Sequence, residues 1–190
     1  MEWWPWGPEA FAEAARLDRP ILLDIGAVWC HWCHVMDGES YEDPAIADIL
    51  RDGFICIKVD RDERPDVDAR YQRAVQALSG VGGWPLTAFL TPQGEVFFGG
   101  TYFPPEPLQG RPSFRQALTS ILKIWHDQRD RVTAQAAAIT NVVRESLDEL
   151  APADPAEELL LAAESLLEKH YEPRFGGWGN GPKFPHPAAI

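Results

Sequence analysis

The stretch Ile21-Leu-Leu-Asp-Ile-Gly-Ala-Val-Trp-Cys-His-Trp-Cys-His34 decides the fold of this chain. It opens with a short run that is apolar apart from one aspartate and has isoleucine at both ends, which is typical of a buried strand. The residues that follow the second cysteine have the character of a helix. Cys30 and Cys33 therefore lie where a strand passes into a helix, with two residues between them. A Cys-x-x-Cys pair at such a position is typical of a redox-active dithiol.

The two cysteines are expected to have different roles. Cys30 is predicted at the helix N-terminus, where unpaired backbone N–H groups and the helix dipole stabilise a thiolate and lower its pKa. Cys33 is expected to be more buried and to keep its proton. Their spacing places both sulfurs on one face of the helix, close enough to form a disulfide. We therefore expect Cys30 to attack as the nucleophile and Cys33 to resolve.

Composition limits the classes of partner. The 190 residues carry a net charge of −12 and contain no lysine- or arginine-rich block, which argues against nucleic acid or an anionic membrane surface as the main partner. No apolar run reaches the length of about 18 residues that indicates a membrane span. The start, Met1 to Gly7, has no features of a secretory signal, and three cysteines do not make a secreted disulfide framework. We expect a cytoplasmic protein.

The rest of the chain alternates predicted helices and strands. The predicted helices are Pro8 to about Leu17, Asp43 to about Gly53, Val67 to about Leu78, a long region from Ser113 that can break near Asp130, and Ala156 to about His170. The further predicted strands are Phe54–Val59, Leu86–Leu90 and Glu95–Phe98, the last two joined as a hairpin.

Two further features of this middle region bear on the chemistry. Cys56, in a predicted strand, is expected to be a small, inert filler of the core, with a part in the redox chemistry as the alternative. The acidic segment Asp60–Asp66, which contains two arginines, is expected to be a solvated, salt-bridged loop, with a binding site for a partner or cation as the alternative.

Four runs of sequence, in order, resemble a known family. They are Cys30–Met36, Ile57–Asp66, Gly82–Leu86 and Phe98–Pro104. Together they are similar to the spermatogenesis-associated thioredoxin-like family, whose members have an N-terminal thioredoxin-like domain and a much longer α/α-toroid domain that resembles sugar epimerases and glycosidases. The residue before the first cysteine, Trp29, departs from the small polar residue usual in that family and is closer to ordinary thioredoxins.

This resemblance implies a fold and a domain division. The fold expected is α/β and thioredoxin-like, with a central mixed sheet flanked by helices and a helical C-terminal extension. Residues 1–150 would form the thioredoxin-like domain and residues 151–155 a linker. Residues 156–190, a helix and a loop rich in glycine and proline, would be the start of a truncated α/α-toroid domain, which would be a partner of the first domain in the full-length protein.

The resemblance also implies roles for two residues outside the dithiol. Asp24 stands where thioredoxin-like proteins keep a buried acid that helps to deprotonate the resolving thiol, and burial in an apolar run should raise its pKa. The alternative is an aspartate at a strand end that caps a loop. Pro85 matches the cis-proline that faces the dithiol and, with Trp84, would receive a substrate strand.

Side chains around the cysteines are expected to tune the redox potential. His31, when protonated, would stabilise the Cys30 thiolate and make the disulfide more oxidising, placing the couple between about −270 and −120 mV. Trp32 adds a flat apolar surface beside the sulfurs, next to Trp29. His34 either tunes Cys33 or packs the helix. No cofactor is expected, and the substrate is a protein or small-molecule disulfide.

Three alternatives to thiol–disulfide exchange remain. Cys30, Cys33 and His34 formally match the pattern for covalent haem attachment, which normally follows export. The same residues with His31 could bind zinc, although four ligands within one helix turn converge poorly on a tetrahedral ion. Finally, the domain could be a non-catalytic or redox-sensing module that docks on the toroid domain.

Overall fold

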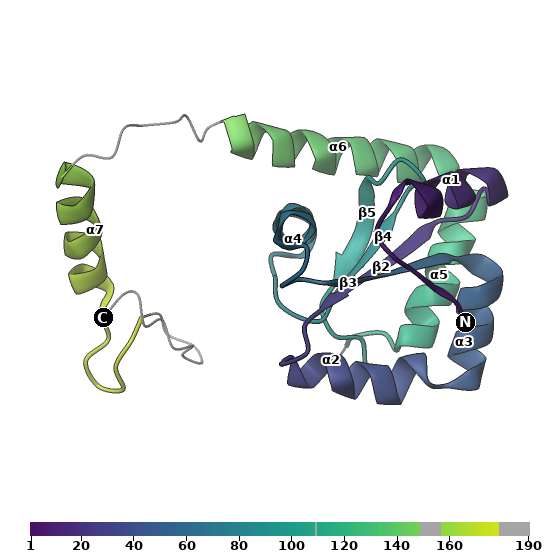
Figure 1. Cartoon of the computed structure of the whole chain (residues 1–190), viewed down its shortest axis with the longest axis horizontal. Coiled ribbons are helices and arrows are strands. Elements are labelled where there is room, and N and C mark those ends of the chain that lie inside the picture. The colour runs from purple at the N-terminus through teal and green to yellow at the C-terminus, as the bar shows by residue number, and fades with distance from the viewer. Residues whose placement is uncertain (109, 149–156, 179–190) are drawn as a thin grey trace. The chain divides into compact units, whose positions relative to one another are not determined.

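The computed structural model describes residues 1–108, 110–148 and 157–178. The chain divides into two compact units, Met1–Glu149 and Leu150–Ile190. The first unit contains a five-stranded mixed sheet in the order β1-β3-β2-β4-β5 (Figure 1). Its strands are β1 (Trp3–Trp4), β2 (Ile21–Gly26), β3 (Ile55–Asp60), β4 (Leu86–Leu90) and β5 (Val96–Gly100).

Strand β2 lies at the centre of this sheet. It pairs in parallel with β3 and antiparallel with β4, while β1 and β5 form the two edges. All six residues of β2 are buried, which explains why its sequence is a nearly continuous apolar run. The predicted strands are confirmed to within two residues at each end, whereas the two-residue strand β1 is not among the predicted elements.

Helices cover the sheet. They are α1 (Pro8–Leu17), α2 (His31–Met36), the π-helical turn η1 (Asp37–Tyr41), α3 (Pro44–Gly53), α4 (Pro65–Ser79), α5 (Phe114–Asp127) and α6 (Arg129–Asp148). Local signals explain two of the starts, since Asp43 caps α3 and Ser113 forms a capping box with Gln116 at α5. The long C-terminal helical region breaks at Gln128, within two residues of the predicted position.

Two apolar clusters pack on the two faces of the sheet. Alternation along β2 sends Leu22 into one cluster, with Met36 of α2 and side chains of α3 and α5. It sends Leu23 into the other cluster, with side chains of α1 and α4. Asp24 has the same parity as Leu22, so it points to the face that α2 covers. The position of the dithiol helix thus follows from the packing of β2.

The second unit contains α7 (Glu157–His170) and the turn that follows it. The indole of Trp178 donates a hydrogen bond to the Leu167 carbonyl at 2.8 Å and closes this turn. Helix α7 agrees with the predicted helix, whereas the predicted linker at 151–155 and the loop beyond 178 lie outside the described residues. Among the described helices, none has the length and apolar character needed to cross a bilayer.

Candidate redox site

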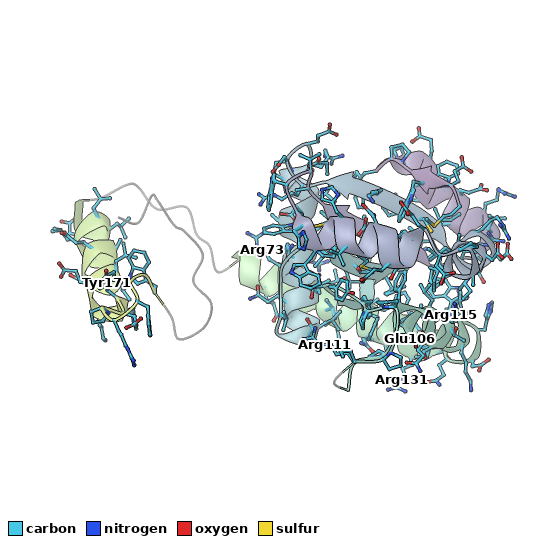
Figure 2. The ribbon with its side chains drawn as sticks, turned by 90° about the horizontal axis from the view of Figure 1, so that it is seen from below. Arg73, Glu106, Arg111, Arg115, Arg131 and Tyr171 are labelled. Carbon is cyan, nitrogen blue, oxygen red and sulfur yellow. A yellow bond between two sulfur atoms is a disulfide. The ribbon has the colours of Figure 1, made fainter. Side chains whose placement is uncertain are left out.

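Cys30 and Cys33 are joined by a disulfide at the start of α2. Cys30 follows β2 after three intervening residues and occupies the N-cap position of the helix, with φ −82° and ψ 102°. Its sulfur accepts a hydrogen bond from the Cys33 N–H at 3.2 Å, and so satisfies one of the backbone donors that a helix start leaves unpaired. Figure 2 views the molecule with α2 toward the reader. The strand-to-helix placement of the pair is as predicted.

The burial of the two cysteines differs from the expectation. Cys30 exposes only 6% of its surface, whereas Cys33 is half-buried, so the prediction that Cys33 is the more buried residue is wrong. The reason is local: the Cys30 side chain folds back over the first turn of α2 to reach the Cys33 N–H. The Cys33 sulfur lies against the end of β2, where a Cβ on Gly26 would come within 3.1 Å of it.

The side chains between and beside the cysteines face solvent. Trp29 and Trp32 expose 58% and 55% of their surfaces, and both His31 and His34 are exposed. The His34 ring donates from Nε2 to the carbonyl oxygen of Val28 at 2.8 Å. This contact ties α2 to the turn that precedes it, which is the packing role considered for His34. Two exposed indoles give the surface around the disulfide an apolar character.

Asp24 is buried in the interior of β2, directly opposite Lys58 of β3. Burial raises the pKa of its carboxyl to about 6, and the positive charge of Lys58 opposes part of this rise. The Lys58 ammonium lies 3.5 Å from Asp24 Oδ2 and 2.6 Å from Asp37 Oδ1. Among the described residues, Asp24 Oδ1 has no hydrogen-bond partner. Asp24 therefore does not cap a loop.

Strand geometry relates this acid to the dithiol. Residues two apart on a strand point to the same side, so Asp24 faces the same side as Gly26, where the Cys33 sulfur lies. Two residues span about 7 Å along a strand. The acid therefore lies on the same side of β2 as the Cys33 sulfur, two residues along the strand from Gly26.

Trp84 and Pro85 immediately precede β4, and the peptide bond between them is cis. Pro85 is buried and Trp84 is half-buried. The Trp84 ring lies edge-to-face on the Trp29 ring, with centroids 5.8 Å apart. This contact brings the turn before β4 next to the residue that precedes Cys30, although 55 positions separate the two tryptophans.

Three residues near the site had no role in the sequence-based prediction. Lys58 and Asp37 form the ion-pair chain to Asp24 described above. The Tyr102 ring lies 5.1 Å from the Trp32 ring, and its hydroxyl donates a 2.6 Å hydrogen bond to Glu39. Lys58 could have been found, since a lysine inside an apolar strand beside a strand with a buried acid predicts a pair. Tyr102 carried no comparable signal.

The residues considered for zinc do not converge in the disulfide form. The sulfurs of Cys30 and Cys33 are bonded to each other, and the Nε2 of His34 is engaged by the Val28 carbonyl. In the part of the chain that the structure describes, no three His, Cys, Asp or Glu side chains are grouped so that they could hold a metal ion.

Comparison with known sequences identifies the family. A family described as "Thioredox_DsbH: Protein of unknown function, DUF255" matches residues 1–144, which is most of the chain. The chain belongs to the Thioredox_DsbH family. The match spans all five strands of the sheet and the dithiol at the start of α2.

Curated relatives confirm the resemblance to the spermatogenesis-associated family. This Thioredox_DsbH chain is 38% identical over 197 residues to spermatogenesis-associated protein 20 of Homo sapiens and 38% identical over 195 residues to the Mus musculus protein of the same name. It is 43% identical over 187 residues to the uncharacterized protein B0495.5 of Caenorhabditis elegans. These alignments cover 97–100% of the chain but only 25% of each relative. The chain thus spans about a quarter of the length of the relatives it matches.

Solved structures confirm the thioredoxin-like fold. A thioredoxin from Thermus thermophilus superposes on the Thioredox_DsbH chain with a TM-score of 0.50 and 23% identity, covering 66% of this chain and 90% of the thioredoxin. At this level of identity the likeness establishes the fold, and the activity has to be argued from the site.

Proposed function

We propose that this chain is a thiol–disulfide oxidoreductase in which Cys30 is the nucleophile and Cys33 the resolving thiol. The observation that carries the proposal is the Cys30–Cys33 disulfide at the start of α2 in a thioredoxin-like fold. A pair that forms a disulfide within one helical turn can store and release two electrons without a change of backbone. The buried acid and the exposed indoles around the pair supply the proton transfer and the apolar surface that such a reaction uses.

The first step begins from the dithiol form. The Cys30 thiolate attacks one sulfur of a substrate disulfide, so that a Cys30–substrate disulfide forms and the substrate S–S bond breaks. The departing substrate sulfur leaves as a thiolate and takes a proton from solvent. The hydrogen bond that the Cys33 N–H donates to the Cys30 sulfur favours the ionised form and so increases the reactive fraction at neutral pH.

The second step releases the substrate. The Cys33 thiol gives its proton to Asp24, and the resulting thiolate attacks the Cys30 sulfur of the mixed disulfide. The Cys30–Cys33 disulfide forms, and the second substrate sulfur leaves as a thiolate, so that the substrate gains two electrons and the chain loses two. A pKa of about 6 keeps Asp24 mostly ionised at pH 7, while its buried position makes it a stronger base than an exposed aspartate.

Four side chains near the disulfide are proposed to contact the substrate or tune the reaction. Trp84 and Pro85 would receive the substrate polypeptide beside the dithiol, because Trp84 packs against the residue that precedes Cys30. Trp32, between the two cysteines in the sequence, offers an exposed apolar face. His31, exposed at the first position of α2, would stabilise the Cys30 thiolate when protonated.

Insulin reduction by the chain, with dithiothreitol as the regenerating dithiol, tests the proposal. The wild-type chain should accelerate the reaction, and Cys30→Ser should abolish the acceleration. Cys33→Ser should retain the attack and accumulate a mixed disulfide with the substrate, detectable by mass spectrometry. A wild-type rate equal to that of the double serine variant would exclude catalysis.

That negative outcome would favour a second function. The relatives are about four times as long as the part that this chain covers. In this second function the chain is a module that docks on a larger partner and uses the dithiol as a redox sensor. In that case the redox state of Cys30 and Cys33 should change the affinity of the chain for the remainder of the full-length protein. Calorimetric titration with the oxidised and the reduced chain measures this difference.

A further inference from the structure

Arg61, in the acidic loop after β3, is held next to the candidate redox site by its backbone and its side chain. Its N–H donates to the carbonyl oxygen of Gly26, the last residue of β2, at 2.9 Å. Its guanidinium carbon lies 4.5 Å from the centroid of the Trp84 ring and 5.8 Å from that of the Trp29 ring. A guanidinium within about 6 Å of two indole faces is attracted by both rings.

Two carboxylates link the same arginine to the same two indoles. The Arg61 Nε lies 3.4 Å from Asp62 Oδ1 and 3.7 Å from Asp68 Oδ2. The other oxygen of Asp62 accepts a 2.8 Å hydrogen bond from the Trp29 indole, and the other oxygen of Asp68 accepts a 2.9 Å hydrogen bond from the Trp84 indole. Arg61 thus belongs to a closed network of contacts, which also includes both carboxylates and both tryptophans. We call this set of five residues the Arg61 network.

We infer that Arg61 is a positioning residue for the proposed reaction: it holds Trp29, beside Cys30, and Trp84, beside Pro85, in the arrangement that receives a polypeptide disulfide. The inference rests on the proposed function for its effect on rate, and on the contacts alone for its effect on the two indoles. Arg61 acts through the tryptophans and makes no bond to the reacting sulfurs.

The contacts in the Arg61 network favour an arginine over a lysine at this position. Asp68 exposes only 5% of its surface, and a carboxylate so buried needs a cation nearby. A planar guanidinium can stack on aromatic rings while it pairs with two carboxylates, whereas a lysine ammonium is a compact, strongly hydrated charge. Gln72 supports the same assembly, because its amide exchanges two 3.0 Å hydrogen bonds with the backbone of Gly83, next to Trp84.

Arg64 provides a matched control from the same loop. It is half-buried and pairs with Asp66 at 2.7 Å, and it has no described contact with either tryptophan. Replacing Arg64 therefore removes an equal charge at a similar place in the sequence, while the contacts of the Arg61 network stay intact.

The experiment compares two disulfides in their reaction with the reduced chain. One is a peptide with an internal disulfide, and the other is the small aromatic disulfide known as Ellman's reagent. Arg61→Met should slow the peptide reaction about tenfold and leave the reaction with Ellman's reagent within about twofold of wild type, because Cys30 keeps its reactivity while the surface for the peptide is lost. Arg61→Lys, which keeps the charge but not the plane, should be intermediate, and Arg64→Met should match wild type.

Hydrogen exchange of the two indole N–H groups gives a readout that does not depend on the reaction. Both should exchange at least about tenfold faster in Arg61→Met than in Arg64→Met, because their carboxylate acceptors are no longer fixed. Unchanged exchange at both indoles, or equal losses with the peptide and Ellman's reagent, overturns the inference. If the wild-type chain reacts with neither the peptide disulfide nor Ellman's reagent, the proposed function is wrong. The exchange data then still decide whether Arg61 holds the indoles. Arg61→Lys serves both measurements if Arg61→Met does not fold.

Discussion

The ammonium of Lys58 lies 3.5 Å from the Oδ2 of Asp24, across the parallel pairing of β2 and β3 that sets these two residues opposite each other. Two opposing effects therefore act on one carboxyl. Burial raises its pKa to about 6, and the lysine charge limits that rise. The pKa of Asp24 is thus set in part by a residue on a neighbouring strand, and this relationship leads to the first two predictions.

Lys58→Met should raise the pKa of Asp24 above its present value of about 6. The substitution removes the charge that stabilises the carboxylate and leaves the desolvation in place. The carboxyl C=O stretch in infrared difference spectra, taken across pH 4–9 with Asp24→Asn as the blank, measures this pKa. Lys123→Met, at an exposed position on α5, should leave it unchanged. A lower pKa in Lys58→Met would contradict the pairing.

Asp24→Asn should stabilise the oxidised chain at pH 8. The folded-state pKa of Asp24 is raised from 3.8 to about 6, so the folded state binds this proton more tightly than the unfolded state. The ionised carboxyl therefore costs stability above pH 6, and a shift of this size corresponds to about 3 kcal/mol. This cost builds up between pH 3.8 and pH 6 and disappears below pH 3.8, where the carboxyl becomes protonated in both states. Urea unfolding should show that Asp24→Asn raises the free energy of unfolding clearly more at pH 8 than at pH 4; an equal increase at both pH values would contradict the prediction.

Gly26→Ala should disturb the resolving cysteine. A Cβ on Gly26 would lie 3.1 Å from the Cys33 sulfur, which is closer than ordinary side-chain contacts, and 3.4 Å from the Cys33 Cβ. We expect a loss of about 1–3 kcal/mol in the free energy of unfolding, together with slower formation of the Cys30–Cys33 disulfide. Gly38→Ala is the control, because a Cβ there meets no atom within 4 Å. Chemical denaturation and thiol titration during air oxidation measure the two effects.

Cys56 should be chemically silent in the folded chain. It is a buried free cysteine, and burial raises the pKa of its thiol to about 12, so at pH 8 only about one molecule in ten thousand carries the thiolate. Iodoacetamide at pH 8 should add nothing to the oxidised, folded chain and one group after unfolding in urea. Intact-mass spectrometry counts these groups. Modification of the folded chain would contradict the prediction, because it would show that the Cys56 thiol is accessible and reactive.

Much of the architecture could be predicted from local patterns. The apolar run at β2, the hairpin of β4 and β5, and the proline and serine signals at helix starts identified most elements of the first unit, because each depends on residues close together in sequence. The strand β1 was missed because two tryptophans have no periodicity of their own. Its pairing with β3 is a tertiary contact.

The order of burial of the two cysteines could not be predicted in the same way. Helix position alone suggested that Cys33 is the deeper residue, but the Cys30 side chain turns back to the Cys33 N–H, and Cys33 remains half-buried. The direction in which the Cys30 side chain turns depends on its own backbone conformation and hydrogen bond, which the spacing of the two cysteines does not specify.

The amino-acid sequence by itself determined that two cysteines one helical turn apart follow a buried strand, and that an aspartate lies within that strand. Only the tertiary structure decided that Lys58 stands opposite this aspartate and that Arg61 joins Trp29 to Trp84. The physical reason is that spacing within one strand and one helix is set by fixed backbone repeats. Contacts between strands and loops depend instead on how distant segments are registered when the core packs.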